Sequence, residues 1–200
     1  MQAMARVNGE IRCIPTNTEK YMSFSLGNLK FIDSVNFMQS SLDKLVKGSE
    51  EFPIMETMIP EENERKLLLQ KGIYPYEYMD SFERFNETQL PKKENFYSSL
   101  SGKAITDEEY AHAHKVWETF GCQTMGNYHD VYLNTDVLLL ADVFENFRKV
   151  CQGKYGLDPA HYYSAPGLSW DALLKKTGVE LELLTDLDRS EEHTSELQSR

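Results

Sequence analysis

The segment Tyr128-His-Asp-Val-Tyr-Leu-Asn-Thr-Asp-Val-Leu-Leu-Leu-Ala-Asp-Val-Phe144 combines a strongly apolar helical run with two polar groups at its start, Tyr132 and Asp136. Residues four apart lie one above the other on a helix, so this phenol and carboxylate are expected to face the same small volume. A carboxylate that holds a divalent metal, beside a phenol that positions a water molecule, suits metal-assisted phosphodiester cleavage. The pair alone is a common pattern, and its meaning depends on the rest of the chain.

Apolar residues recur at helical spacing through this region and predict a helix from near Asn127 to Lys149. Asp136 is expected at the edge of a buried stripe, where a carboxylate is costly unless it is paired or bound to a metal. Asp130 and Asp142 lie six residues to either side of Asp136, off its face, and are expected to be exposed. The residues that share the helical spacing are Asp136, Val137, Leu140, Ala141, Phe144 and Phe147.

The N-terminal part of the chain contains a predicted β-hairpin. Two alternating runs, 21–26 and 29–37, flank Gly27-Asn28, which has glycine at the first position of a two-residue loop, as a type II′ turn requires. Residues 41–48 predict a short helix with a serine near its start and a glycine stop. Residues 49–66 are acidic and contain two prolines, so an irregular segment is expected there.

Further helices are predicted in the C-terminal half. Thr106 and Glu109 have the spacing of a capping box, and the helix that they open places Tyr110, Ala113, Trp117 and Phe120 on one face. Asp158-Pro159 can cap a short turn, and residues 169–178 read as one more helix. A hairpin, an irregular middle and consecutive helices indicate a mixed α/β domain.

Composition limits the classes of protein that fit. The chain has 200 residues, of which 40% are hydrophobic and 12% aromatic, enough for a packed core in one domain. No apolar run of about 18 residues and no N-terminal apolar region is present, so neither a membrane span nor a secretory signal is expected. Three widely separated cysteines indicate a reducing compartment without disulfides or a zinc module. The net charge of −11 disfavours binding to duplex DNA by this chain alone.

Residues 189–199, Arg-Ser-Glu-Glu-His-Thr-Ser-Glu-Leu-Gln-Ser, correspond to the in-frame translation of a common sequencing adapter. We therefore expect residues 189–200 to be non-native, with the natural sequence ending near Asp188. His193 lies in this tail and is not counted as a metal ligand. A natural polar tail is the alternative.

Several segments together resemble the protein-primed family B DNA polymerases of organelles and viruses, especially those of large self-synthesising DNA transposons. The resemblance covers essentially residues 10–188. The segments that carry it are Phe31-Ile-Asp-Ser-Val-Asn-Phe37 with Ser41-Leu-Asp-Lys-Leu45, Lys71-Gly-Ile-Tyr-Pro-Tyr76, Tyr128 to Phe144, and Tyr155-Gly-Leu-Asp-Pro-Ala-His-Tyr-Tyr-Ser-Ala-Pro-Gly-Leu-Ser-Trp170. Their order and spacing are specific, whereas no single segment would suffice.

The resemblance implies a 3′–5′ proofreading exonuclease domain with an RNase H-like fold. Tyr132 and Asp136 match the family's third exonuclease motif, Tyr-x3-Asp, in which the carboxylate helps to bind the catalytic metals and the tyrosine orients the attacking water. Lys71 matches a lysine that supports cleavage in related phage polymerases, and a solvated lysine before a turn is the equal alternative. The implied cofactors are two Mg²⁺ or Mn²⁺ ions. The implied partners are a DNA primer-template, a single-stranded 3′ end, deoxynucleotides and a terminal protein. The implied location is inside the cell, in the nucleus or at the site where the element or virus replicates.

The chain lacks several of the family's motifs. Neither Asp-x-Glu nor Asn-x3-Asp, the first and second exonuclease motifs, occurs in the first 40 residues. The paired aspartates of the polymerase site are absent as well. The expected organisation is therefore a partial exonuclease domain lacking its N-terminal strands over residues 1–150, followed by a helical connector over 151–188. A non-catalytic remnant of a mobile element, and an unrelated RNase H-like nuclease, remain alternatives.

Other polar residues invite a functional interpretation, but a structural role is preferred for most of them. Asp33 is expected to be a structural or edge carboxylate, and His112 and His114 lie two apart on a helix and make a poor metal pair. A capping or surface role is expected for His129. Tyr74, Tyr76 and Tyr78 suit either stacking on single-stranded bases or packing of an irregular loop.

Overall fold

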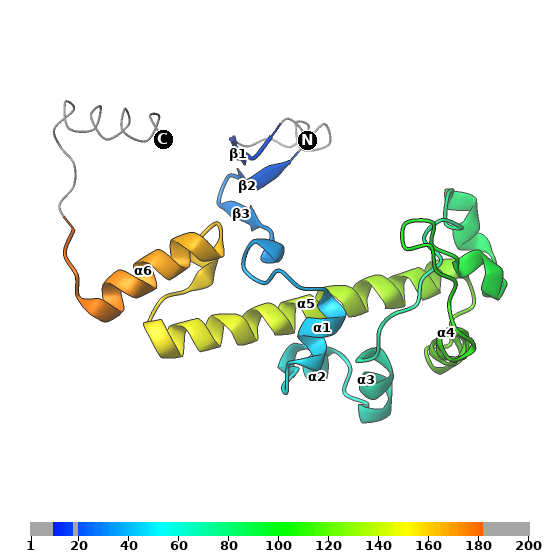
Figure 1. The fold of residues 1–200 in the computed structure, drawn as a ribbon. Helices are drawn as coiled ribbons and strands as arrows, with labels where there is room; N and C mark the ends of the chain where they lie inside the picture. Colours follow the sequence, from blue (N-terminus) through cyan, green and yellow to red (C-terminus); the bar gives the residue numbers. More distant parts are fainter. Residues whose placement is uncertain (1–9, 18–19, 182–200) are drawn as a thin grey trace.

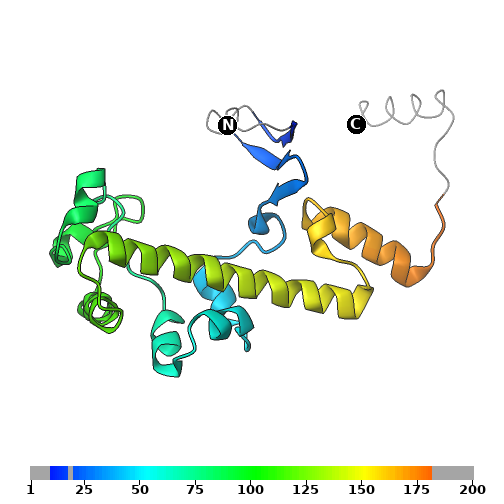
Figure 2. The same ribbon diagram turned by 180° about the vertical axis from the view of Figure 1, so that it is seen from behind.

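A computed structural model of the chain describes residues 10–17 and 20–181. The 31-residue helix α5 (Met125–Tyr155) runs the length of the molecule, and the other elements lie along it (Figure 1). The view from behind shows the same arrangement: the chain turns back after α5, and α6 (Ala165–Thr177) then lies beside the C-terminal end of α5 (Figure 2). The fold is mixed and mostly helical, with one small three-stranded antiparallel sheet.

Helix α5 is longer at both ends than the apolar pattern predicted. It begins at Met125 because Thr124 and Asn127 form a capping box, in which each side chain accepts a hydrogen bond from the other residue's backbone N–H. It ends at Gly156, which has a φ of 62° and provides the left-handed conformation common at helix C-termini.

The sheet has the order β1 (Ile11–Pro15), β2 (Tyr21–Leu26) and β3 (Leu29–Ile32). The predicted hairpin of β2 and β3 is confirmed, with Gly27 at a φ of 56° as a type II′ turn requires. The second strand is shorter than predicted, because the Asp33 side chain accepts a hydrogen bond from the Val35 N–H and turns the chain into a 3-10 helix, η2 (Ser34–Asn36). Asp33 thus has the structural role expected of it. Strand β1 was not predicted.

The short helix α1 (Leu42–Lys47) is confirmed and ends at Gly48. The prediction of an irregular segment over residues 49–66 is wrong, since α2 (Pro53–Met58) and the first five residues of α3 (Glu62–Leu68) lie there. Neither helix has a capping hydrogen bond from its own N-cap side chain, and both pack on other helices through buried residues. Tertiary contacts rather than local signals therefore define them.

The C-terminal predictions are largely confirmed. The Thr106–Glu109 capping box opens α4 (Asp107–Thr119), and the Asp158 side chain accepts from the Ala160 N–H to cap η5 (Pro159–His161). Helix α6 begins at Ala165, four residues before the predicted start, after an extended Ser164 and with a proline in its first turn. Two further 3-10 helices, η3 (Phe82–Asn86) and η4 (Lys93–Phe96), lie between α3 and α4.

The main core lies where α1 to α4 meet the N-terminal two-thirds of α5. The predicted buried stripe of α5 is confirmed only in part: Phe144 and Phe147 pack against a second buried cluster, whereas Val137 and Leu140 are 57% and 40% exposed. Apolar residues occur on several faces of α5, so spacing alone did not identify the face that packs. The α5 residues that are buried instead are Met125, Tyr128, Thr135, Leu139, Asp142, Val143 and Cys151.

The expectation that Asp142 is exposed is also wrong, since its side chain is completely buried. Its two carboxylate oxygens accept hydrogen bonds from the backbone N–H groups of Ile54 and Met55, at 2.8 and 2.9 Å. Asp142 therefore caps the N-terminus of α2 from a neighbouring helix, which is how a buried carboxylate is stabilised here without a cation. Asp130 is exposed, as expected.

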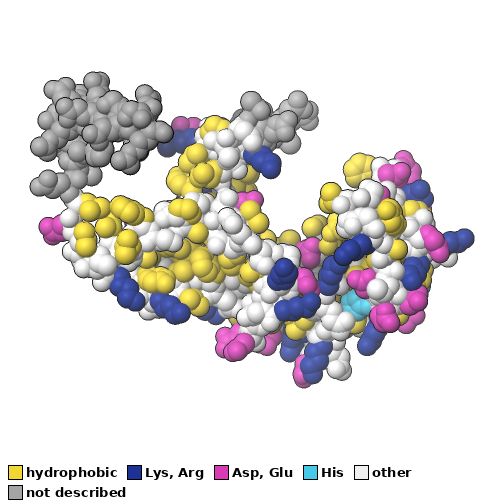
Figure 3. Space-filling view, in the orientation of Figure 1, with side chains coloured by type: hydrophobic (Ala, Val, Ile, Leu, Met, Phe, Trp, Pro, Cys, Tyr) yellow, Lys and Arg dark blue, Asp and Glu magenta, His cyan; other side chains and the backbone are white. Residues whose placement is uncertain are grey.

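Apolar side chains are gathered over the sheet and between the sheet and α6 (Figure 3). Leu29 and Phe31 of β3 are 62% and 40% exposed, and they lie on one face of the sheet with their cross-strand partners Leu26 and Phe24. All three cysteines are free. Within residues 10–17 and 20–181, no helix is both long enough and apolar enough to cross a membrane.

Candidate functional site

The three residues singled out from the sequence line one groove, which has a volume of about 250 Å³. Tyr132 and Asp136 come from consecutive turns of α5, while Lys71 comes from the loop that follows α3. The opposite wall belongs to α1 and the residues around it. The full lining is Ser41, Leu42, Asp43, Val46, Leu69, Gln70, Lys71, Gly72, Tyr76, Tyr132, Asp136 and Leu139.

Tyr132 is held by the aromatic residues of the loop over 72–78. Its ring stacks on the ring of Tyr74, with 4.8 Å between centroids and 27° between planes, and its hydroxyl is hydrogen-bonded to the hydroxyl of Tyr76. Burial, the bond with Tyr76 and the negative charge of Asp136 all raise the pKa of the Tyr132 phenol. The phenol therefore stays protonated at neutral pH, so it can orient a water molecule but cannot act as a base.

Asp136 is half-buried at the groove wall. Burial raises the pKa of the Asp136 carboxyl, and its interaction with the Tyr132 hydroxyl opposes part of that rise. The Tyr132 hydroxyl is hydrogen-bonded to the Tyr76 hydroxyl, and it also interacts with the Asp136 carboxylate. A partly desolvated carboxylate favours a cationic partner in the groove.

Lys71 lies at the edge of this groove with 66% of its side chain exposed. Its ammonium group pairs with Glu109 of α4, whose Oε1 lies 4.0 Å from the lysine Nζ. Exposed ion pairs of this kind contribute little energy, so the ammonium group can reorient at small cost. The place of Lys71 in the groove lining fits a functional role, whereas the high exposure of its side chain fits an ordinary solvated lysine. The role of Lys71 therefore stays a prediction.

The sequence interpretation missed Asp43 as a groove residue, whereas it had singled out Tyr76 as one of a cluster of three tyrosines. Asp43 adds a second carboxylate to the lining, and Tyr76 adds a hydroxyl beside that of Tyr132. Asp43 is paired with Lys47 at 2.9 Å, four residues later, which in sequence is the pattern of an ordinary surface ion pair. Only the packing of α1 against α5 brings Asp43 to the groove.

A two-ion centre requires more carboxylates than the groove supplies. Asp136 and Asp43 line it, and Asp43 is already paired with Lys47. Among residues 10–17 and 20–181, no three His, Cys, Asp or Glu side chains come together in a way that could hold a metal ion. The described residues therefore do not fit a complete metal centre, and Asp136 could contribute only one ligand to it.

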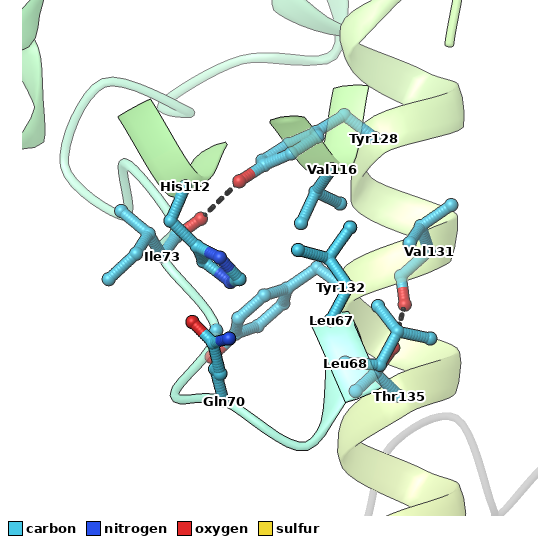
Figure 4. A pocket seen from close by; sticks show the side chains of 11 residues that line it. Leu67, Leu68, Gln70, Ile73, His112, Val116, Tyr128, Val131, Tyr132 and Thr135 are labelled. Carbon is cyan, nitrogen blue, oxygen red and sulfur yellow. Dashed lines mark hydrogen bonds between the residues drawn. The ribbon is translucent and has the colours of Figure 1, made fainter. Parts of the chain in front are cut away.

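A second, smaller cavity of about 20 Å³ lies behind Tyr132 (Figure 4). Its lining includes His112 of α4, whose imidazole pKa is lowered by burial and by Lys115, and Tyr128, whose hydroxyl donates to the Ile73 carbonyl at 2.6 Å. His112 is thus a partly packed histidine, in agreement with the structural role preferred for it, and it belongs to the wall that supports Tyr132.

His129 does not have the capping or surface role expected of it. Its Nδ1 is 2.7 Å from the hydroxyl of Tyr74, and its ring lies edge-on to Phe85 with 4.9 Å between centroids. His129 therefore supports the tyrosine on which Tyr132 stacks. Tyr78 belongs elsewhere, since its hydroxyl donates to Glu87 at 2.7 Å and Arg84 covers its ring.

Comparison of the chain with known protein families, with curated proteins and with solved structures finds no match in any of the three. The described residues define a mixed, mostly helical protein with a small antiparallel sheet. Its candidate site is a groove in which a protonated tyrosine lies beside a half-buried carboxylate, with the exposed side chain of Lys71 also in its lining.

Proposed function

We propose that this chain is part of the 3′–5′ proofreading exonuclease region of a protein-primed family B DNA polymerase, and that the groove is one wall of the exonuclease site. The observation that carries the proposal is that Tyr132, Asp136 and Lys71 line a single groove. These are the three residues that the family resemblance singled out. Helical spacing alone pairs Tyr132 with Asp136, but it does not bring Lys71 to them.

Each residue has a distinct role in this proposal. Asp136 supplies one carboxylate to a two-metal centre whose remaining ligands lie outside the described residues. Tyr132 keeps its proton because burial raises its pKa, and it orients the water that attacks the terminal phosphodiester. Lys71, on its exposed side chain, neutralises negative charge on the phosphate.

Uncovered apolar surface supports the view that further protein packs on this chain. Leu29 and Phe31 of the sheet and Val137 and Leu140 of α5 are all at least 40% exposed. A groove of about 430 Å³ joins the end of β3 to this face of α5. Extended apolar surface of this kind is typical of an interface rather than of a monomer's outer face. In the proposal, the missing strands and the polymerase region cover it.

The net charge of −11 agrees with a chain that does not hold the DNA by itself. Proteins that bind DNA alone usually carry a basic surface that contacts the phosphate backbone. In the proposal, other parts of the polymerase hold the primer-template, the incoming deoxynucleotides and the terminal protein. This chain contributes only the wall next to the single-stranded 3′ end.

The proposal is tested by recovering the flanking coding sequence and purifying the longer protein. We expect an intact Asp-x-Glu and Asn-x3-Asp upstream, polymerase motifs downstream, and Mg²⁺-dependent trimming of a single-stranded 3′ end. Stop codons or lost carboxylates upstream would support a remnant of a mobile element instead. A reading frame that ends soon after Asp188 would support an unrelated RNase H-like nuclease.

A further inference from the structure

Gly72 lies so close to Tyr132 that no side chain fits between them. A Cβ atom built on Gly72 would lie 2.6 Å from Cε2 and 3.0 Å from Cδ2 of the Tyr132 ring. Both distances are shorter than a normal carbon–carbon contact of about 3.5–4.0 Å. Gly72 is not among the glycines with a positive φ, so its backbone conformation is open to any residue. Glycine is therefore needed at position 72 because the Tyr132 ring occupies the space of a side chain, and not because of the backbone conformation.

Two more residues of the same loop fix the ring at other points. Tyr74 stacks on it, and Tyr76 binds its hydroxyl. Gly72, Tyr74 and Tyr76 together form what we call the Tyr132 cradle. His129 holds Tyr74 in turn through a hydrogen bond of 2.7 Å.

Space beside the ring decides what would move if Gly72 acquired a side chain. Tyr132 lines both the cavity of about 20 Å³ behind it and the groove of about 250 Å³ in front. The small cavity cannot accept a displaced aromatic ring, whereas the groove can. A Cβ on Gly72 would therefore displace the ring and, with it, the hydroxyl that is hydrogen-bonded to Tyr76.

We propose that Gly72 and Tyr76 are positioning residues for the Tyr132 hydroxyl. Gly72 leaves the room in which the ring lies, and Tyr76 holds the hydroxyl at the position where it faces the charge of Asp136. This positioning is a property of the described structure. Its effect on catalysis rests on the proposed function.

A thermodynamic cycle in the 200-residue chain tests the contact itself. We expect Gly72→Ala to lower the urea midpoint of unfolding in the presence of Tyr132, and to leave it unchanged or slightly raised in a Tyr132→Ala background. The general effect of exchanging glycine for alanine is common to both backgrounds and cancels in the comparison. An equal loss of the urea midpoint in both backgrounds would overturn the proposal. If Gly72→Ala alone does not fold, the double variant with Tyr132→Ala is still expected to fold, and its failure to fold would also overturn the proposal.

Fluorine NMR of the chain labelled with 3-fluorotyrosine tests the position of the ring. The Tyr132 resonance is assigned from its loss in Tyr132→Phe. We expect Gly72→Ala and Tyr76→Phe to shift it, and Gly153→Ala to leave it in place, because Gly153 lies on the same helix with no atom near its Cβ position. An unshifted Tyr132 resonance in folded Gly72→Ala would contradict the proposal.

The catalytic consequence is measured in the longer recovered protein. Gly72→Ala should lower kcat for 3′ trimming about 10-fold to 100-fold, with little change in KM, as for other residues that orient a catalytic group. If the longer protein does not trim DNA in any form, the proposed function fails while the NMR result still stands. If it trims DNA and Gly72→Ala is fully active, the positioning role is wrong.

Discussion

The carboxylate of Asp142 on α5 accepts a hydrogen bond from the backbone N–H of Met55, 2.9 Å away, at a position that solvent does not reach. Met55 lies in the first turn of α2, whose own N-cap residue, Phe52, has no side chain that can accept a hydrogen bond. The long helix thus provides the cap that the short helix lacks. This link joins the 49–66 segment to the element that carries the candidate site.

Replacing Asp142 should therefore destabilise the fold strongly. Asp142→Ala leaves the buried N–H of Met55 and the partly buried N–H of Ile54 without partners, and we expect the free energy of unfolding to fall by about 3 kcal/mol. Asp130→Ala, at an exposed position of the same helix, should change it by less than about 0.5 kcal/mol. Urea unfolding followed by circular dichroism measures both, and equal effects of the two substitutions would contradict the capping role.

The glycines of α5 should respond in opposite directions to the same substitution. Gly153 lies within the helix with open space around it, so Gly153→Ala should stabilise the protein by up to about 1 kcal/mol. Gly156 has a φ of 62° and the Lys175 Nζ lies 2.8 Å from its Cβ position, so Gly156→Ala should cost about 1 kcal/mol or more. Thermal melting distinguishes the two, and a gain at both positions would rule out the assigned helix end.

The ion pair of Arg148 and Asp158 predicts a pH dependence of stability. The hydrogen bonds from Arg148 lower the pKa of the Asp158 carboxyl from 3.8 to about 2. Because the folded-state pKa is the lower one, this contribution to stability is present above about pH 4 and disappears as the pH falls towards 2.

Asp158→Asn should remove that contribution. We expect the urea midpoint of wild type to exceed that of the variant at pH 5, and the difference to shrink steadily as the pH is lowered towards 2. Asp130→Asn is the control for general loss of a carboxylate on the surface. A difference between wild type and Asp158→Asn that does not change with pH would mean that the carboxylate charge of Asp158 does not stabilise the fold.

The purified 200-residue chain should not trim DNA. Among the residues that the structure describes, the groove supplies too few carboxylates for two metal ions. A single-stranded oligonucleotide incubated with the chain and Mg²⁺ should keep its full length on a sequencing gel. Clear Mg²⁺-dependent shortening from the 3′ end would mean that the chain holds a complete site of its own.

Local signals explain which parts of the fold could be predicted from the sequence. The Gly27 turn and the Thr106–Glu109 capping box each depend on residues within a few positions of one another, and both were predicted correctly. Helix α2 was missed because its cap, Asp142, lies almost 90 residues away. The exposure of Asp142 was mispredicted for the same reason.

The same distinction between local signals and long-range contacts applies to the candidate site. The pairing of Tyr132 with Asp136 follows from helical spacing, whereas Lys71 lines the same groove because of how the loop after α3 packs. The places of Asp43 and Tyr76 depend on how α1 and the 72–78 loop pack on α5, which no local pattern reveals. His129 was mispredicted because its partner, Tyr74, is 55 positions earlier in the chain.

The most direct test of the proposed exonuclease role is the rate of 3′ trimming by the longer recovered protein with Asp136→Asn compared with Asp130→Asn. Both carboxylates lie on α5, but only Asp136 lines the groove beside Tyr132. We predict that Asp136→Asn lowers kcat at least about 100-fold while Asp130→Asn retains wild-type activity. Equal activity of the two variants would contradict the assignment of the groove as the exonuclease site.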